Sequence, residues 1–366
     1  MSWIIGILRE VRDPRDVNAR HSLTDILFVA LAATLCGAKT CVEIAEFADE
    51  RLEYLREIVP LPHGAPSHDT FSRVFRLLDP VELERALTRC VAALGKELGV
   101  PRAGRVVAVD GKALRRGYEK GCAHLPPLMV SVWDSETRLA LASALAPGGS
   151  EVQATLDLLR SLALKGCIVT ADALHCHPAM AEAVLARKAH YALTLKGNHG
   201  PLFAAAEAGF AAAKELDFHE TTEHAHGRME RRRAAVLGVG ALSDLPHFPG
   251  LRAIGRIEAE RTGGSGRTEC EMRYVALSRL LPPRRFASVI RTHWGIENQL
   301  HWVLDVVFDE DDARSRKDYA PQNLAVIRRI AQNILRAHPS PKSMASKMRR
   351  ANWNRAFFFD LFAHMR

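Results

Sequence analysis

Two short apolar runs that each end in an aspartate constrain the fold of this chain more than any other feature. RVVAVD ends at Asp110 and CIVTAD ends at Asp172, and both runs are rich enough in β-branched residues to be buried strands. A third acidic residue, Glu297, lies inside the helical pattern RTHWGIENQLHWVLDVVFDED. Because buried strands rarely end in carboxylates, we expect the three side chains to form one metal site.

The residue types of this site indicate which metal it would bind. A cluster of carboxylates with no partnering Cys or neutral His favours Mg²⁺ or Mn²⁺ over Zn²⁺. Two such ions, roughly 3.5 to 4 Å apart, can activate the attacking oxygen and stabilise the leaving oxygen of an in-line displacement at phosphorus. The sequence therefore predicts phosphate chemistry of the kind that nucleases and polymerases perform.

The pattern around the two runs predicts an α/β fold with a ribonuclease-H-like core. Three strands are followed by a helix, a strand, a helix and a fifth strand. In that fold the first and fourth strands lie side by side, so Asp110 and Asp172 would face one another. The expected strands are RVVAVDGKAL, the two around the DSET turn in PPLMVSVWDSETRLALASAL, CIVTADAL and HYALTLKGN, and the expected helices are SEVQATLDLLRSLALKG, ending at Gly166, and PAMAEAVLARKA, with Pro178 in its first turn.

We expect four segments along the chain. Residues 1–97 form an N-terminal helical domain that is a candidate for DNA binding, although its short helices fit a small bundle as well as a helix-turn-helix. Ser22 or Thr24 is expected to cap one helix, and Ser67 or Asp69 another. Residues 101–214 form the first part of the core, 215–280 an inserted β-rich region with TGGSG as a hairpin connection, and 281–366 the helix of Glu297 and a basic tail.

Positive charge is concentrated at the C-terminal end. The net charge is +8, and residues 313–366 alone contain twelve Lys or Arg against two Asp, which is +10 and leaves −2 for the remainder. The segments RSRK, IRRI and KMRRANWNR predict a positive surface suited to a polyanion. A solvated helix face without a partner is the alternative.

The remaining composition predicts a cytoplasmic protein without a membrane anchor. Charges interrupt every apolar stretch well before the ~20 residues that span a bilayer, and the start MSWIIGILREVRDPRD lacks the features of a signal peptide. The seven cysteines are odd in number and form no CxxC pair, so we expect them to be reduced and mostly buried.

The whole chain resembles the DDE-type bacterial insertion-sequence transposases, specifically the IS4-like ISAs group, to which the H-repeat-associated proteins belong. Each similar stretch is weak alone, but their order and spacing from about residue 10 to 340 are specific. The stretches are HSLTDIL, GAPSHDTFSRVF, VAVDGKALRRG, IVTADAL, YALTLKGN, EHAHGRMERR, HWGIENQLHWVLDVVFDEDDAR and NLAVIRRIAQNIL.

The resemblance implies that Asp110, Asp172 and Glu297 are the catalytic DDE triad and the ligands of two Mg²⁺ or Mn²⁺ ions. It implies a nucleoid-associated transposase that cuts the ends of its own element in double-stranded DNA and joins their 3′-hydroxyls to a target, working as a homodimer at synapsis. An RNase-H-like nuclease or resolvase without transposition is one alternative. A domesticated DNA-binding protein without catalysis is another, and the intact triad argues against it.

The chain departs from the signature of related IS4-type enzymes in one respect. Those enzymes place a Tyr and an Arg seven and four residues before the Glu and a Lys seven after it, where this chain has Ile290, His293 and Leu304. The DNA contacts of that Arg and Lys are therefore not expected here, although His293 could still approach a phosphate.

Other residues near these motifs have structural and functional interpretations. The HxxxExxxH array of His293, Glu297 and His301 would share one helical face and could be mistaken for a zinc site. Trp294 and Trp302 are expected to pack, and the acidic residues after Glu297 (Asp305, Asp309, Glu310, Asp311) to form a helix-end acidic face. The cluster of His175, Cys176 and His177 lacks a fourth ligand. Candidate DNA contacts are Lys196, Arg228, Arg231, Arg232, His293, Arg349, Arg350 and Arg355.

Overall fold

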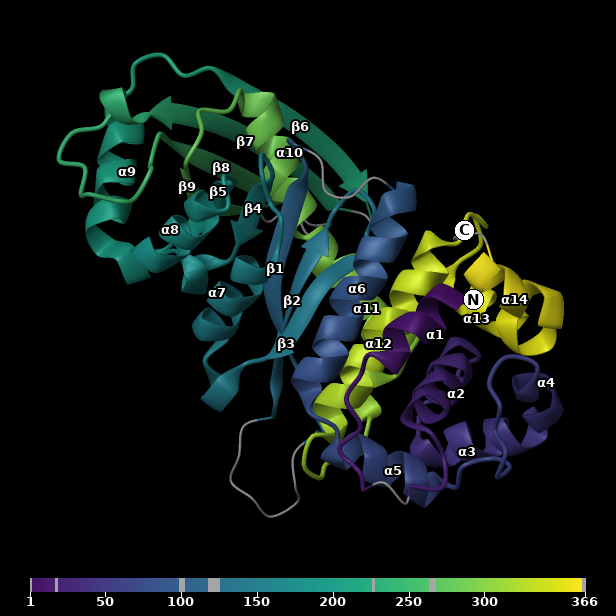
Figure 1. The fold of residues 1–366 in the computed structure, drawn as a ribbon. Helices are drawn as coiled ribbons and strands as arrows, with labels where there is room; N and C mark the ends of the chain where they lie inside the picture. Colours follow the sequence, from purple (N-terminus) through teal and green to yellow (C-terminus); the bar gives the residue numbers. More distant parts are fainter. Residues whose placement is uncertain are drawn as a thin grey trace. The chain divides into compact units, whose positions relative to one another are not determined.

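The computed structural model describes residues 2–16, 19–98, 103–117, 126–225, 228–262 and 268–363, and Figure 1 shows its helices and strands. The chain divides into two compact units. Unit 1 comprises Met1–Val100, Gly111–Ala154 and Glu297–Arg366, and unit 2 comprises Pro101–Asp110 and Thr155–Ile296. This division crosses the four predicted segments, whose boundaries stay predictions.

Unit 1 is mainly helical. Two of the predicted caps are present: Ser22 Oγ accepts a hydrogen bond from Asp25 N, and Ser67 Oγ accepts one from Thr70 N. The helices are α1 (Ser2–Arg9), α2 (Leu23–Leu35), α3 (Cys41–Glu50), α4 (Leu52–Arg56), α5 (His68–Leu77), α6 (Pro80–Leu98), α11 (Trp302–Val306), α12 (Ala320–Ala337), α13 (Met344–Trp353) and α14 (Arg355–Ala363).

Helix α12 forms the centre of unit 1, where it packs against α2, α5 and α6. Every residue from Ala320 to Leu335 is buried, including polar ones. Buried polar groups need partners, and the backbone supplies them: Asn323 Nδ2 donates to the carbonyls of Phe75 (2.8 Å) and Leu78 (2.7 Å). Asn333 forms two 2.9 Å hydrogen bonds with the backbone of Ala140. The amides therefore fix the register of α12 against its neighbours.

Unit 1 also contains a β-hairpin of β2 (Leu128–Asp134) and β3 (Ala140–Leu145). The predicted DSET turn joins them. Asp134 Oδ2 accepts hydrogen bonds from Thr137 N (3.4 Å) and Thr137 Oγ1 (2.6 Å), the local bonding that makes Asp a turn residue.

Unit 2 contains a large mixed sheet, which confirms an α/β fold. Its spatial order is β1 (Val106–Ala113, of which unit 2 holds the part up to Asp110), β4 (Ile168–Ala171), β5 (His190–Leu195), β9 (Thr268–Leu277), β8 (Ala253–Thr262), β7 (Arg228–Gly238) and β6 (Phe218–Ala225). The pairs β1/β4 and β4/β5 are parallel, and the others are antiparallel. The strands of the predicted β-rich region therefore continue the sheet of β5. That this region is an insertion, and that the core is ribonuclease-H-like, stay predictions.

The helix predicted to end at Gly166 ends earlier. Helix α7 spans Glu151–Ser161, beginning in unit 1 and ending in unit 2. The residues after it bond to strand ends instead, because Gly166 N donates to Lys188 O and Gly166 O accepts from Gly104 N. Gly166 has φ +77°, which favours glycine there.

Helix α10 covers the sheet of unit 2. This unit also contains α8 (Pro178–Ala186), which begins at the expected Pro178, and α9 (Gly200–Ala212). Helix α10 (Pro283–His293) packs against β4, β6, β7 and β8. Phe286 of α10 is fully buried, and its ring lies over Gly255, where an added Cβ would be 2.2 Å from the ring. The helix can therefore approach β8 only where β8 lacks a side chain.

Other expectations concern cysteines and membranes. The six cysteines within the described residues are free, and three of them (Cys90, Cys167, Cys176) are buried. Cys122 and most of the TGGSG connection lie outside the described residues. Among the described helices, none combines the length and apolar character needed to cross a membrane.

Replacing Gly255 by alanine tests the packing of α10. The added methyl group overlaps the buried ring of Phe286, so we expect Gly255→Ala to lower the free energy of unfolding by about 1–3 kcal/mol. Gly238→Ala is the control, because its Cβ meets no heavy atom within 4 Å. Urea denaturation measures both, and equal midpoints for the two variants would contradict the observed packing.

Candidate active site

The two aspartates predicted to face one another lie at the ends of neighbouring strands. In the parallel pair of β1 and β4, Val106 is level with Ile168 and Ala108 with Thr170. Continuing this register by two residues places Asp110 level with Asp172, on the same face of the sheet, because side chains alternate between faces. Adjacent strands are about 4.8 Å apart, and two carboxylates so close repel each other unless a cation lies between them.

Asp172 also shapes the backbone after β4. Its Oδ1 accepts a hydrogen bond from Leu174 N (3.0 Å) and caps the short turn Ala173–His175. Asp172 is exposed, and Asp110 is partly exposed. Both side chains can therefore be reached from solvent.

His293, the last residue of α10, lies over the same face of the sheet. Its Nδ1 is 3.0 Å from Thr170 Oγ1, and Thr170 precedes Asp172 by two residues on β4. Burial lowers the pKa of His293 to about 4, although Asp172 acts in the opposite direction. The imidazole is therefore neutral near pH 7 and can offer a hydrogen bond but no charge.

The helix predicted around Glu297 is not continuous. Helix α10 ends at His293, and a π-helical turn occupies Glu297–His301 before α11 begins. This turn bonds i to i+5. Glu297 is exposed and His301 is buried, and His293 belongs to unit 2, so the shared face expected for the HxxxExxxH array stays a prediction. Gln332 Nε2 donates to Gln299 O (3.2 Å), which ties the turn to α12. Single π turns are frequent at functional sites.

Glu297 is exposed and is the first residue of the last segment of unit 1. Asp110 and Asp172 belong to unit 2, so the approach of Glu297 to them stays a prediction. His301, four residues on, is buried. Its pKa is lowered to about 3, first by burial and then by the positive charges of Arg329 and Lys112. Two neighbouring cations make this histidine a poor zinc ligand.

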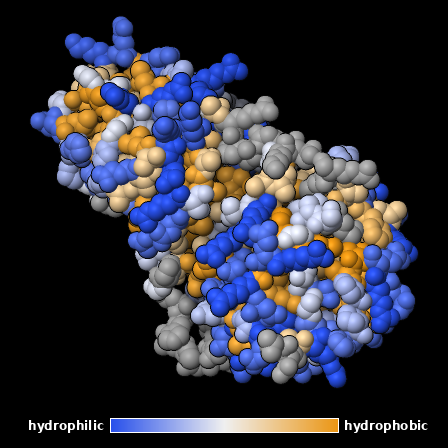
Figure 2. All heavy atoms as spheres, in the orientation of Figure 1, coloured by the Kyte–Doolittle hydropathy of each residue, from blue (hydrophilic) through white to orange (hydrophobic). Residues whose placement is uncertain are grey.

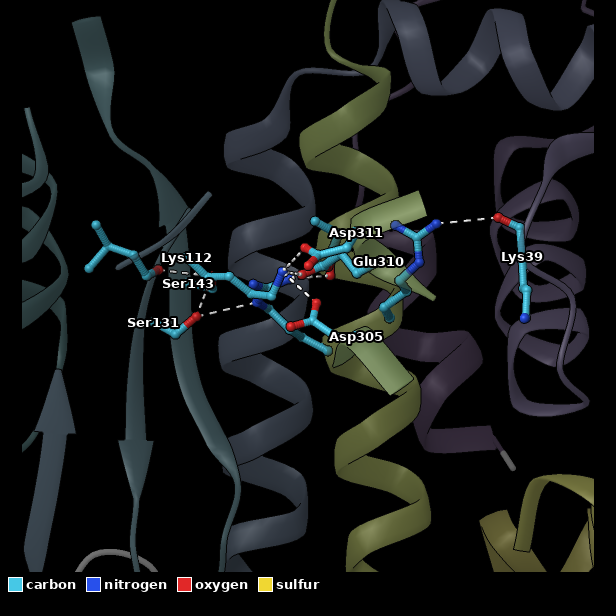
Figure 3. Close-up of polar contacts among 11 residues, drawn as sticks. Lys39, Lys112, Ser131, Ser143, Asp305, Glu310 and Asp311 are labelled. Atoms are coloured by element: carbon cyan, nitrogen blue, oxygen red, sulfur yellow. Dashed lines mark hydrogen bonds and ion pairs between the residues drawn. The ribbon is translucent and has the colours of Figure 1, made fainter. Parts of the chain in front are cut away.

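Unit 1 contains a group of charges that we call the Lys112 network: Lys112, Asp305, Glu310, Asp311 and Arg329 (Figure 3). Lys112, Glu310 and Arg329 are buried, and Asp305 and Asp311 are partly exposed. Lys112 Nζ lies 2.6 Å from Asp305 Oδ1, 2.7 Å from Asp311 Oδ1 and 3.7 Å from Glu310 Oε2. Arg329 Nη1 lies 2.9 Å from Glu310 Oε1, and both side chains are 0% exposed. The network joins the end of β1 to α12 and to the segment after α11.

Each buried charge of the network has partners of opposite sign. Burial alone would raise the pKa of Glu310, but Arg329, Arg328 and Lys112 together lower it. The pKa of Asp311 is likewise lowered against the effect of burial, mainly by Lys112. The guanidinium of Arg329 also donates to Ser131 Oγ (3.3 Å) and Ala325 O (2.9 Å). A buried ion pair is tolerated only when its hydrogen bonds are satisfied in this way.

Two expectations about charge are corrected by this network. The residues Asp305, Glu310 and Asp311 do not form a solvated acidic face, because they surround Lys112. The arginines of IRRI, Arg328 and Arg329, are buried and do not contribute to a basic surface.

One acidic residue near Asp110 was missed from sequence. The carboxylate of Glu151, at the start of α7, lies against Gly111. A Cβ added to Gly111 would be 2.7 Å from the carboxylate carbon of Glu151. Gly111 follows Asp110 directly. No motif marks Glu151, because an acidic residue in the first turn of a helix is common for reasons of helix electrostatics.

The predicted DNA contacts on the β-strands are already paired. Arg231 contacts Glu220 (2.8 Å) and Glu260 (3.7 Å), and Arg232 contacts Glu230 (2.7 Å), so the strands β6, β7 and β8 share a balanced set of charges. On the visible face of each unit, hydrophilic and hydrophobic residues are interspersed (Figure 2). Lys196 is exposed, and the side chain of Arg228 lies outside the described residues. DNA contact by any of them stays a prediction.

The basic tail is partly engaged with unit 1 itself. Arg355 pairs with Glu57, and the guanidinium of Arg350 lies 4.2 Å from the ring centre of Phe357. Lys347 is buried and donates to the carbonyls of Leu335 and His338. Arg349 is exposed. Contact of Arg349, Arg350 and Arg355 with DNA stays a prediction.

The remaining candidates have structural roles or unexpected exposure. His177 caps α8, its Nδ1 accepting from Met180 N (3.2 Å), while His175 and Cys176 are buried and the pKa of the Cys176 thiol is raised by burial to about 12. Trp294 and Trp302 are 41% and 55% exposed, so neither side chain is buried, and the expectation that they pack stays a prediction. Trp294 instead stacks with Arg273, at 4.9 Å.

Comparison with known proteins gives consistent results. The family model for the transposase DDE domain matches residues 101–334, and one described as DDE_Tnp_1-associated matches residues 5–91. The chain is 32% identical to "Putative transposase YncI" of Escherichia coli O157:H7, over 91% of this chain and 86% of that protein. It is 31% identical to "H repeat-associated putative transposase YhhI" of Escherichia coli strain K12, over 98% of this chain and 96% of that protein. Among solved structures, a piggyBac transposase synaptic complex with hairpin DNA is similar over 99% of this chain and 78% of that chain. Its sequence identity is 13% and its TM-score is 0.45, a likeness too weak to identify the fold.

Replacing Lys112 by methionine tests the buried network. The change keeps the apolar stem but leaves three carboxylates without their shared cation, so we expect a loss of about 3–5 kcal/mol in the free energy of unfolding. Lys39→Met is the matched control, because Lys39 forms an exposed pair with Asp309 (3.2 Å), which is worth at most about 1 kcal/mol. Adding Asp305→Asn and Asp311→Asn to Lys112→Met should restore part of the loss. Equal urea midpoints for the two lysine variants would refute the network's role.

Proposed function

Because this chain belongs to the family of DDE transposases, we propose that it cleaves the DNA ends of its own insertion element and joins them to a target. The observation that carries this proposal is the pair of carboxylates, Asp110 and Asp172, at the level ends of two neighbouring parallel strands. Glu297 is the third member of the proposed catalytic set.

The reaction we propose has two displacements at phosphorus. First, a water oxygen attacks the phosphorus at the element end, the bond from phosphorus to the 3′-oxygen breaks, and the products are a 3′-hydroxyl and a 5′-phosphate. Next, that 3′-hydroxyl attacks a target phosphodiester and displaces a 3′-oxygen of the target strand. In each step one P–O bond forms as another breaks, the attacking group releases a proton to solvent, and the leaving 3′-oxygen takes up a proton from solvent. No covalent link to the protein is needed.

Two divalent ions, Mg²⁺ or Mn²⁺, fit the residues present. The side chains of Asp110, Asp172 and Glu297 offer only oxygen donors, which these ions prefer. The repulsion between Asp110 and Asp172 at adjacent strand ends favours a cation between them. When bound, the ions would activate the attacking oxygen and stabilise the leaving oxygen.

His293 would contribute to DNA binding through a hydrogen bond and not through a positive charge. Its ring is held at Thr170 on the face that carries the aspartates, and burial keeps it neutral near pH 7. A neutral imidazole can hydrogen-bond to a phosphate oxygen without competing with a metal ion for the carboxylates. This is the one position of the family signature where we propose a substitute for the absent arginine.

The proposed partner is double-stranded DNA, both the element ends and the target. Bringing two ends together suggests a homodimer, and binding to DNA suggests association with the nucleoid.

Amide substitutions test the catalytic set. We expect Asp110→Asn, Asp172→Asn and Glu297→Gln each to reduce cleavage more than about a hundredfold, which exceeds the loss of a typical supporting contact around a metal, while folding and DNA binding persist. Asp157→Asn is the control, because Asp157 forms an exposed pair with Arg160 on α7 (2.6 Å). The measurement is single-turnover cleavage and strand transfer of end-labelled duplexes. Near-parental cleavage by any of the three variants would remove that residue from the set.

A second test concerns the metal. Cleavage should require Mg²⁺ or Mn²⁺, whereas Ca²⁺ should support DNA binding with little turnover because its coordination is looser. Calorimetric titration with Mn²⁺ gives a readout apart from activity, and Asp110→Asn should weaken the binding seen there. Activity that persists in EDTA, or that depends on Zn²⁺, would overturn the carboxylate site.

A further inference from the structure

A small pocket in unit 1 lies far along the chain from the catalytic residues. It is formed between the loop that precedes α2 and the helix α5, and its volume is about 290 Å³. This is near the lower limit of small-molecule sites, so it suits a small anion or one group of a larger molecule. The lining residues are Arg15, Asp16, Ala19, Arg20, His21, Thr70, Arg73 and Val74.

Two of the three arginines that line this pocket have no ion pair or hydrogen bond within the part of the chain that the structure describes. Arg15 is held by Asp13 through two hydrogen bonds (2.9 and 2.8 Å) and donates to His21 O (2.8 Å). Arg20 and Arg73 are exposed, and neither guanidinium has an ion pair or hydrogen bond with another described residue. Asp16 is the only acidic residue among the described lining. The pocket therefore presents two uncommitted guanidinium groups.

This distinguishes Arg20 and Arg73 from other arginines of the same helical region. Arg76, one turn further along α5, pairs with Asp318 (2.7 Å). Arg85 and Arg89 of α6 pair with Glu82 (2.8 Å) and Glu10 (2.5 Å). Arg76, Arg85 and Arg89 therefore each have a carboxylate partner, whereas Arg20 and Arg73 have none among the described residues.

The third feature is a buried histidine with an unsatisfied atom. His21 is 9% exposed, and its Nδ1 has no hydrogen-bond partner within the described residues. An unpaired buried polar atom is unfavourable, so a ligand that hydrogen-bonds to Nδ1 would be stabilised here. The His63 ring packs against it edge-on at 6.0 Å. The pocket thus offers a hydrogen-bonding atom beside two cations.

We propose that Arg20, Arg73 and His21 bind one phosphate group of the DNA backbone. A guanidinium matches two phosphate oxygens at once, and the imidazole nitrogen can complete the contact. Arg15 is a positioning residue, because it holds the loop through His21 O. Phosphate contacts position a protein on DNA without reading its sequence. This site rests on the proposed function only in taking DNA as the partner.

The test is the salt dependence of DNA binding. Removing the contact to this one phosphate with Arg20→Gln and Arg73→Gln together should reduce the slope of log K against log[salt] by about 0.9, the value for one phosphate. The loss should be equal for a terminal and a random duplex. The control is Arg85→Gln with Arg89→Gln, which removes the same charge from arginines that already have carboxylate partners. Fluorescence anisotropy on the full chain measures all three proteins, and circular dichroism checks their folding.

A conservative pair of variants separates charge from loop disruption. Arg20→Lys with Arg73→Lys keeps both positive charges but loses the guanidinium groups that can donate two hydrogen bonds at once. This variant should therefore keep the salt slope and bind DNA more weakly than the parent. If it loses the slope as fully as the glutamine pair, the loop has been disturbed and the proposal fails.

The other outcomes are also decisive. An unchanged slope in the glutamine pair, with a normal slope in the parent, rejects this pocket and leaves the proposed function standing. A loss confined to the terminal duplex would mean that the pocket reads bases, which contradicts a phosphate contact. Unchanged DNA binding with lost binding of a polyglutamate probe would assign the pocket to an acidic peptide. A parent protein that binds no DNA would refute the proposed function itself.

Discussion

The buried Lys112 network is the interaction on which unit 1 depends. Desolvating an ion costs several kcal/mol, and only complete pairing offsets this cost. Lys112 on β1, Glu310 before α12 and Arg329 inside α12 meet that requirement together. Each of them comes from a different part of the chain. None of these elements can shift without exposing an unpaired charge to the protein interior, so the network fixes their register more sharply than apolar packing would.

This constraint bears on the proposed chemistry because of where the network residues stand along the chain. Lys112 follows Asp110 by two residues, and Asp305 follows Glu297 by eight. The contact of Lys112 with Asp305 (2.6 Å) therefore fixes, within unit 1, the strand end next to one proposed ligand and the segment after another. The hydrogen bond from Gln332 to Gln299 also ties the π-helical turn to α12.

The sequence predicted local features well and the partners of buried charges badly. The caps Ser22 and Ser67 follow from patterns within a few residues, and the parallel neighbours β1 and β4 follow from the expected order of strands and helices. Whether a charged side chain is buried does not follow from such patterns, because its partner can lie anywhere along the chain. Arg329 is buried because Glu310 and Ser131 accept its hydrogen bonds, and Ser131 lies 198 residues away. The π-helical turn at Glu297 likewise has no signature in a pattern read at a period of 3.6.

Net charge is consequently a poor guide to where this protein would meet DNA. The tail contains an excess of +10, yet Arg328, Arg329 and Lys347 are buried and Arg355 is paired. The arginines of β7 are likewise balanced by glutamates across the strands. The arginines that can bind a phosphate are those without a carboxylate partner, because a guanidinium in an ion pair must first release that partner. The number of basic residues in a segment does not show this. By this criterion a pocket with two uncommitted arginines outweighs a longer run of basic residues.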